Sequence, residues 1–451
     1  MSVHVIAILV LVAAFVIATL LPINLGALSL VAAFIIGSLV LDGPPDDVAD
    51  KIFADFPGNL FVILVGVTFL FAIARANGTV DWLVQIAVRG VRGRIALIPW
   101  IMFAVTAVLT AFGAVVPAAV AIIAPVGLGF AVRHRINPVL MGLSIINGAS
   151  AGGFSPLAIF GVITNGVVVK SNLPGSPLTL FLGSLIFNTL LNVVVFFIFG
   201  GRELLGRVAS VETASAATEV APGGGPGAAR AQTTGATGAG FTEPAHPPVT
   251  SLDLNRVLTL VVLVALAVGA LAFQLDVGLL AVTAAVLLSL LAPNTYKGAV
   301  AQVAWPTVLL ICGIVTYVNL LQEIGTIKFL GNLVATIGVP LLAALVICYI
   351  GAAVSAFAST TGILGALIPL AVPFLLAGHV GAVGLITALA ISASVVDSSP
   401  FSTSGALVTA NAPEERRDYV YRRLMAWGFS MVAIAPTVTW LLLVVPGWLG
   451  G

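Results

Sequence analysis

The sequence is poor in charged residues: Asp, Glu, Lys and Arg make up only 8% of its 451 positions. A soluble domain carries about a quarter charged residues, so this scarcity excludes an ordinary soluble globule. Apolar runs of about 20 residues recur along the chain, and a membrane-spanning helix needs that length. The formal net charge of +1 gives no indication of nucleic-acid binding, so we expect no nucleic-acid partner.

Cysteine is scarce as well. Cys312 and Cys348 both lie within apolar runs, which predicts buried, unpaired thiols and excludes a disulfide or a metal role. The first apolar segment, 3–21, has neither a basic region before it nor a small-residue cleavage site after it. We therefore expect a retained span here and not a removable signal peptide.

Ten apolar segments predict full membrane spans: 3–21, 24–41, 58–76, 138–168, 178–199, 255–273, 276–292, 305–322, 380–410 and 424–447. Two further stretches, 98–132 and 341–378, are too long for one span, because about 35 helical residues measure about 52 Å against a hydrocarbon core of about 30 Å. Internal glycines and prolines predict that each folds back as a re-entrant hairpin. Such backbone is tolerated only inside protein or beside a water-filled cavity, so the hairpin tips are candidate site elements.

The distribution of basic residues predicts the orientation. With the N-terminus outside, all 18 Lys and Arg residues except Lys51, Lys170 and Lys328 fall on one side, which the positive-inside rule makes cytoplasmic. We expect a multi-pass protein of a bacterial cytoplasmic (inner) membrane with both termini outside. Residues 206–252, rich in Gly, Ala and Thr, predict a flexible cytoplasmic linker between a repeat at 1–205 and a repeat at 253–451.

Short motifs of the first half recur in the second half at an offset of about 245 residues. The matched pairs are Gly78-Thr79 with Gly325-Thr326, Thr110-Ala111-Phe112 with Ser355-Ala356-Phe357, Pro125 with Pro369, Ser155-Pro156 with Ser399-Pro400, and Gly161 with Gly405. Each half holds an odd number of spans, so the second half enters the membrane from the opposite side. The predicted fold is an all-α polytopic membrane protein with two inverted-topology repeats, each of five transmembrane helices plus one re-entrant hairpin, with one broken helix per repeat.

The broken helices are the spans 138–168 and 380–410, which Gly, Ser and Pro interrupt at 147–156 and 392–405. Helix N-termini at mid-membrane present N–H groups to an anion, while unwound carbonyls and hydroxyls coordinate a cation such as Na⁺. Asp397 is the one acidic residue at such a depth. Two interpretations stay open for it: a cation or proton site, and a structural helix cap.

The predicted site residues are polar residues and glycines of these breaks and hairpin tips. The predicted substrate-binding residues are Asn147, Ser150, Gly152, Gly153, Ser155, Ser359, Thr360, Thr361, Ser398, Ser399, Ser402 and Thr403. The predicted cation ligands are Gly113, Asn147, Ser359, Thr360 and Asp397. No Arg or Lys lies in the four elements, so a carboxylate substrate would be held by hydroxyls, helix ends and a co-bound cation.

Two other classes of function are disfavoured. An intramembrane serine protease could use Ser404, but its base would have to lie within hydrogen-bond reach, and His379 begins the span that Ser404 nearly ends. A passive channel would not need an inverted repeat. We therefore expect a carrier with no catalytic residues and no cofactor beyond a co-transported ion, Na⁺ or H⁺.

Several of these motifs resemble known families. Ser359-Thr360-Thr361 with Ile368-Pro369 resembles the second hairpin tip of the ion-transporter superfamily that includes the divalent anion–sodium symporters, whereas Ala114-Val115-Val116 departs from the first tip. The opening Pro22-Ile23-Asn24-Leu25-Gly26 and the 147–156 break resemble the malonate carrier (MatC-type dicarboxylate carrier) family. These resemblances imply cation-coupled uptake of malonate or a related dicarboxylate, an elevator-like motion and a homodimer. A C4-dicarboxylate, citrate or gluconate importer and an arsenite-type exporter are the alternatives on the same fold.

Overall fold

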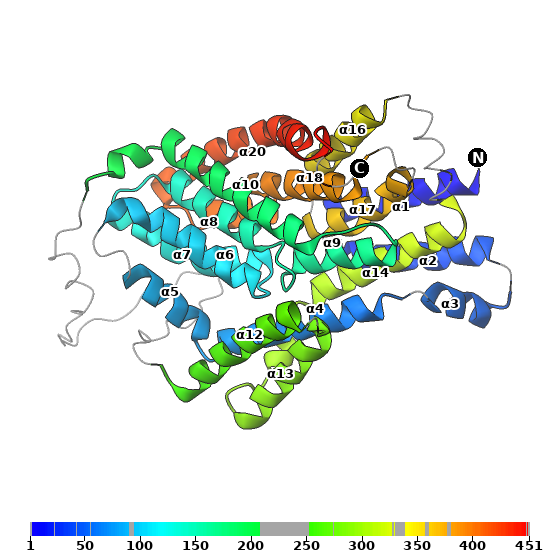
Figure 1. Ribbon diagram of the computed structural model, residues 1–451, viewed down its shortest axis with the longest axis horizontal. Coiled ribbons are helices and arrows are strands. Elements are labelled where there is room, and N and C mark those ends of the chain that lie inside the picture. Colours follow the sequence, from blue (N-terminus) through cyan, green and yellow to red (C-terminus); the bar gives the residue numbers. More distant parts are fainter. Residues whose placement is uncertain are drawn as a thin grey trace, which may run out of the picture.

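The structure is a computed structural model that describes residues 2–449 apart from 22, 42, 55, 90–93, 208–251, 274, 327–328, 330–338, 357–359, 377–379 and 448. The described residues form helices and turns with no strand. Most of the helices run side by side along the long axis of the molecule (Figure 1). The predicted linker, 206–252, lies almost wholly outside the described residues.

The described part of the first half contains ten α-helices: α1 (Val3–Leu20), α2 (Leu25–Val40), α3 (Pro45–Ala54), α4 (Gly58–Ala76), α5 (Thr79–Arg89), α6 (Ile98–Ala111), α7 (Val116–Arg133), α8 (Pro138–Gly152), α9 (Ile159–Lys170) and α10 (Pro177–Ile198). The described part of the second half contains α12 (Leu254–Ala272), α13 (Val277–Leu291), α14 (Trp305–Glu323), α16 (Pro340–Ser355), α17 (Thr360–Leu376), α18 (Ala382–Val395), α19 (Thr403–Ala410) and α20 (Arg417–Thr439). Short 3₁₀ turns include η2 (Gly201–Leu204), η4 (Val396–Ser398) and η5 (Glu414–Arg416).

The surface of this bundle is suited to lipid. Six described helical stretches are long and apolar enough to cross a membrane, and shorter apolar helices accompany them. Large apolar side chains stand exposed on the outer helices, such as Leu39 of α2 and Leu290 of α13, while all of α8 is buried. The chain is therefore an all-helical, polytopic membrane protein in its described part.

The predicted interruptions coincide with helix ends. The 138–168 segment is divided into α8 and α9, and the 380–410 segment into α18, η4 and α19. The 98–132 stretch forms α6 and α7, and the 341–378 stretch forms α16 and α17; in each case the two helices pack together. The two thiols, Cys312 and Cys348, are buried and unpaired, as their apolar surroundings predict.

The helix formed by residues 45–54 is missing from the sequence predictions. Residues 45–54 form α3, although the sequence analysis assigns no element to this acidic segment. Asp46 and Asp47 lie in its first turn, near the partial positive charge of the helix N-terminus, and Lys51 lies in its last turn, near the partial negative charge of the C-terminus. Both placements stabilise the helix. The segment is too short and too polar to register as a span, which is why the search for apolar runs passed over it.

The helices of the two halves contact each other reciprocally. The second predicted span of each half packs on the third predicted span of the other: α2 packs on α14, and α13 packs on α4. A β-carbon on Gly26 would overlap the carbonyl oxygen of Leu309, and one on Gly313 would overlap that of Gly26, so the backbones of α2 and α14 touch. Likewise α7 packs on α19 and α17 packs on α9. The matched residues Gly78 and Gly325 share a positive φ of 73° and 78°.

Candidate functional site

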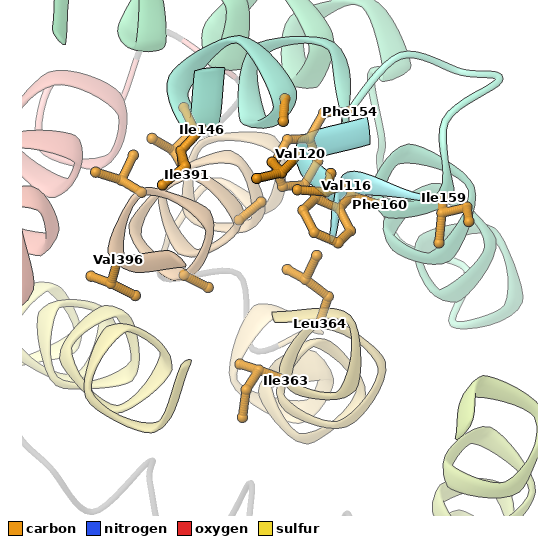
Figure 2. Close-up of a cluster of buried hydrophobic side chains, with 14 of the residues drawn as sticks. Val116, Val120, Ile146, Phe154, Ile159, Phe160, Ile363, Leu364, Ile391 and Val396 are labelled. Carbon is orange, nitrogen blue, oxygen red and sulfur yellow. The ribbon is translucent and has the colours of Figure 1, made fainter. Parts of the chain in front are cut away.

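The two breaks and the two hairpins meet around one apolar cluster (Figure 2). Val116 from the start of α7 lies beside Phe160 of α9, and the Leu364 side chain of α17 points toward Phe160. Ile391 of α18 and Val396 of η4 complete the group, and all five side chains are buried. Elements far apart in sequence thus share one core, as a site built from both halves requires.

The matched serines of the two breaks make the same local contact. The Ser155 hydroxyl accepts a hydrogen bond from the Leu157 N–H at 3.2 Å, and the Ser399 hydroxyl accepts one from the Phe401 N–H at 3.3 Å. A β-carbon on Gly161 would overlap the Ser155 carbonyl oxygen, and one on Gly405 would overlap the Ser399 carbonyl oxygen. The repeated sequence motif therefore corresponds to a repeated backbone geometry.

Asp397 lies in η4 and is buried. Its carboxylate accepts a hydrogen bond from the Ser404 hydroxyl at 2.6 Å, which ties η4 to the first turn of α19. Ser402 caps α19 by accepting from the Gly405 N–H, and its own hydroxyl donates to the carbonyl oxygens of Asp397 and Ser399. No cluster of three or more His, Cys, Asp or Glu residues that could hold a metal ion occurs among the described residues.

The described part of the second hairpin tip is bonded internally. The Thr360 hydroxyl lies 2.9 Å from the Ser355 hydroxyl, which donates to the Ala393 carbonyl oxygen at 2.7 Å. The Ser398 hydroxyl of the neighbouring break donates to the Val395 carbonyl oxygen. Ser359, predicted to bind both substrate and cation, lies outside the described residues. These bonds fix the tip against α18.

The first half contains buried polar groups without partners. The Asn147 side-chain nitrogen and the hydroxyls of Ser144 and Ser150, all on α8, make no hydrogen bond to the described residues. On α10, Asn188 leaves its oxygen unbonded and Asn192 leaves both polar atoms unbonded. An unpaired buried polar group costs about 1–3 kcal/mol, so several such atoms on two helices need another partner.

These groups lie along the contact between α8 and α10, which pack closely. The Ser184 hydroxyl of α10 donates to the Ser150 carbonyl oxygen at 3.1 Å, and this bond fixes the position of α10 along α8. Ser184, Asn188 and Asn192 follow each other at intervals of four, so they share one face of α10. We name these three residues with Ser144, Asn147 and Ser150 the polar seam. The sequence analysis missed its α10 side, although polar residues every fourth position in an apolar span were a visible signal.

A cavity of about 590 Å³ lies where the hairpins reach the α1, α2 and α14 helices. It is lined by first-turn residues of four helices and of the described start of α17: Leu25 of α2, Pro117 of α7, Thr307 of α14, Thr361 of α17 and Thr403 of α19. Five helix N-termini thus border one space. A helix N-terminus carries a partial positive charge of about half an elementary charge, and its uncapped N–H groups favour an anion.

The cavity wall is otherwise neutral. No Arg or Lys occurs among the described residues that line it. The Asn24 side chain accepts from the Gly26 N–H at 2.9 Å and donates to the Pro306 carbonyl oxygen at 2.9 Å, which holds the starts of α2 and α14 together. The starts of α7 and α14 have no side-chain cap. The wall therefore offers hydroxyls and helix dipoles in place of fixed charges.

The predicted site residues divide between these places. Thr361 and Thr403 line the cavity. Asn147 and Ser150 belong to the polar seam. Gly152 faces α6, where a β-carbon would overlap the Ala107 carbonyl oxygen, so α6 fills the space that its missing side chain leaves. Gly113 forms the turn of the first hairpin with a φ of 104°.

The predicted set also omitted the part of the cavity formed by Asn24 and Thr307, because nothing in the sequence brings α2 and α14 to the hairpin tips. A capping Asn directly before a predicted helix was the available signal.

The N-terminal third of the chain matches a known family. Residues 1–153 match the family described as dicarboxylate carrier protein MatC N-terminus. The match ends inside the first break and confirms the resemblance seen in the opening segment and in that break. No curated protein matches the chain.

Proposed function

We propose that the chain is a cation-coupled secondary transporter that imports malonate or a related small dicarboxylate, and the match of residues 1–153 to the MatC N-terminal family supports this proposal. The substrate binds in the cavity bordered by the five helix N-termini. One observation carries this proposal: an anion-favouring space enclosed by both hairpin tips, the second break and the starts of α2 and α14, with no basic side chain among its described lining residues.

The chemistry of the cavity fits a small dianion. Its volume of about 590 Å³ lies within the usual range of small-molecule sites. A helix N-terminus stabilises a nearby negative charge by about 0.3–2 kcal/mol, and several termini act on two carboxylates at once. The hydroxyls of Thr361 and Thr403 supply donors that select carboxylate oxygens. A site without a guanidinium releases its anion more readily, which transport requires.

Alternating access is the proposed mechanism, and the reciprocal helix contacts support it. The pairs α2–α14 and α13–α4, and the pairs α7–α19 and α17–α9, are what a two-fold relation between inverted repeats would produce. Inverted repeats can exchange conformations and so open one site to each side in turn. We further propose that the hairpins and broken helices move together in an elevator-like step, and that the protein acts as a homodimer.

A co-transported cation balances the substrate's charge in this proposal. Asp397 is the one carboxylate in the described residues of the breaks and hairpins, and the break around it is rich in hydroxyls. Such oxygens coordinate Na⁺, and the second tip resembles a sodium-site motif. Na⁺ is therefore the proposed ion, with H⁺ at Asp397 as the alternative.

Uptake of radiolabelled malonate into proteoliposomes tests the function. We expect uptake to be driven by an inward Na⁺ gradient and to be inhibited by excess unlabelled malonate more strongly than by succinate, citrate or gluconate. Uptake driven by an inward proton gradient in the absence of Na⁺ would show that H⁺, and not Na⁺, is the coupling ion. Absence of malonate uptake under both gradients, with uptake of another anion, would contradict the proposed substrate.

A further inference from the structure

A second cavity, of about 770 Å³, lies at the end of the bundle where α7 turns into α8 and where α10 ends. Four arginines line it, from four separate segments: Arg135, Arg207, Arg416 and Arg423. We propose that this cavity binds the headgroup of an anionic phospholipid. Basic pockets between membrane helices commonly take such headgroups.

The charge of the cavity favours an anion. Only two carboxylates, from Glu203 and Glu415, stand against the four guanidinium groups in the lining. The guanidinium groups of Arg135 and Arg416 make no hydrogen bond or ion pair with the described residues, although the Arg135 backbone carbonyl accepts a hydrogen bond from Arg207. Two cationic side chains are thus available to a phosphate, for which the planar guanidinium offers paired N–H donors.

Two of the four arginine side chains are also held in position. Arg207 donates to the His134 carbonyl oxygen at 2.8 Å, which fixes its guanidinium at the turn between α7 and α8. Arg135, in the same turn, adopts a left-handed backbone with a φ of 50°, a conformation that few residues with a β-carbon adopt. The Arg423 guanidinium lies over the Tyr419 ring at 5.5 Å. A preorganised set loses less entropy when it binds a ligand.

The walls of the cavity distinguish a lipid from a soluble anion. Val132 and Ile198, on the last turns of α7 and α10, line it and are each 60% exposed. They continue the apolar outer surface of those helices up to the arginines, so a molecule with a charged head and an acyl chain can contact both. A phosphate ion would leave this apolar surface uncovered. The occupant that fits is therefore a phospholipid of the surrounding bilayer.

Lipid retention tests the proposal without any transport assay. The full chain is purified from vesicles of phosphatidylcholine mixed with phosphatidylglycerol, and the retained phospholipid is identified by native mass spectrometry. We expect the wild type to retain phosphatidylglycerol in preference to phosphatidylcholine. The double variant Arg135→Gln/Arg423→Gln should lose this preference, by about fivefold in affinity for each arginine removed.

The control variant is Arg133→Gln/Arg422→Gln. It removes the same charge from the same two helical regions, but neither residue lines the cavity. Equal loss of lipid in both variants would show that lipid retention depends on surface charge and not on the cavity, and it would overturn the proposal. So would displacement of the retained lipid by millimolar inorganic phosphate. If the double variant does not purify as a folded protein, the single variants Arg135→Gln and Arg423→Gln give the same comparison.

Discussion

The two breaks share a backbone geometry but differ in how their polar groups are satisfied. In the second break, the hydroxyls of Ser398, Ser402 and Ser404 all donate hydrogen bonds to neighbouring oxygens. Ser402 donates to the Asp397 carbonyl oxygen and Ser404 donates to the Asp397 carboxylate. In the first half, Asn147 and Ser150 belong to a seam that keeps several buried polar atoms unbonded. The second break is thus internally complete, whereas the first half needs a partner from outside the protein chain. Water, substrate or a cation can fill that role.

The largest expected effect comes from substituting the matched glycines, which tests whether the two breaks are equivalent. Gly161→Ala and Gly405→Ala should each destabilise the protein by about 3 kcal/mol or more, because the new methyl group overlaps a backbone carbonyl oxygen that cannot move aside. Thermal unfolding in detergent measures the loss. Gly129→Ala on α7 is the control, since its β-carbon would have no atom within 4 Å. Destabilisation at only one of the two glycines would show that the breaks are not equivalent.

The polar seam provides the next largest effect. Asn192→Leu should leave stability unchanged or raise it, because it removes two unbonded polar atoms, but it should lower malonate uptake about 5- to 150-fold if those atoms hold water or an ion during transport. Parallel melting and uptake measurements separate the two outcomes. Thr189→Val on the same helix is the control, because the Thr189 hydroxyl already donates to the Leu185 carbonyl oxygen. Full uptake by Asn192→Leu would make the seam a packing feature.

A substitution of Asp397 tests the second break in the same way. Asp397→Asn keeps an acceptor for Ser404 but removes the charge, so we expect it to raise the Na⁺ concentration for half-maximal uptake about tenfold with little change in the pH profile. If the proton is the coupled ion, the variant loses its pH dependence and keeps any Na⁺ dependence.

Ser404→Ala is the control for that variant, since it removes the hydrogen bond and keeps the charge. Identical ion dependence in wild type and Asp397→Asn would leave Asp397 with a structural capping role.

The smallest effect separates two adjacent threonines of the second tip. Thr361 lines the cavity, so Thr361→Val should raise the KM for malonate by about 2- to 12-fold, the value of one hydrogen bond. Thr360 is bonded to Ser355, so Thr360→Val should lower the melting temperature and change KM little. Uptake kinetics and melting curves on both variants give the two readouts. A higher KM for Thr360→Val, with little change for Thr361→Val, would indicate that the substrate binds beside Thr360 and not in the cavity.

The sequence predicts much of this fold because membrane constraints act locally. A hydrocarbon core of fixed thickness makes overlong apolar runs visible, and so the breaks near 152 and 398 and both hairpins follow from length and breakers alone. The cavity does not follow, because its wall joins Asn24 and Thr307 to Thr361 and Thr403 across two halves. Such long-range packing depends on which small residues allow helices to touch, and a single sequence does not pair Gly26 with Gly313.

The contact of Gly26 with Gly313 also limits how the molecule can move. Two helices whose backbones touch cannot slide along each other without first separating, since no flexible side chain lies between them to change rotamer. The α2–α14 pair therefore behaves mechanically as one rigid piece. Asn24 adds a hydrogen-bonded link at its end. A conformational cycle has to place its displacement at other interfaces, and the backbone amides of α2 and α14 should be among the slowest to exchange with solvent deuterium.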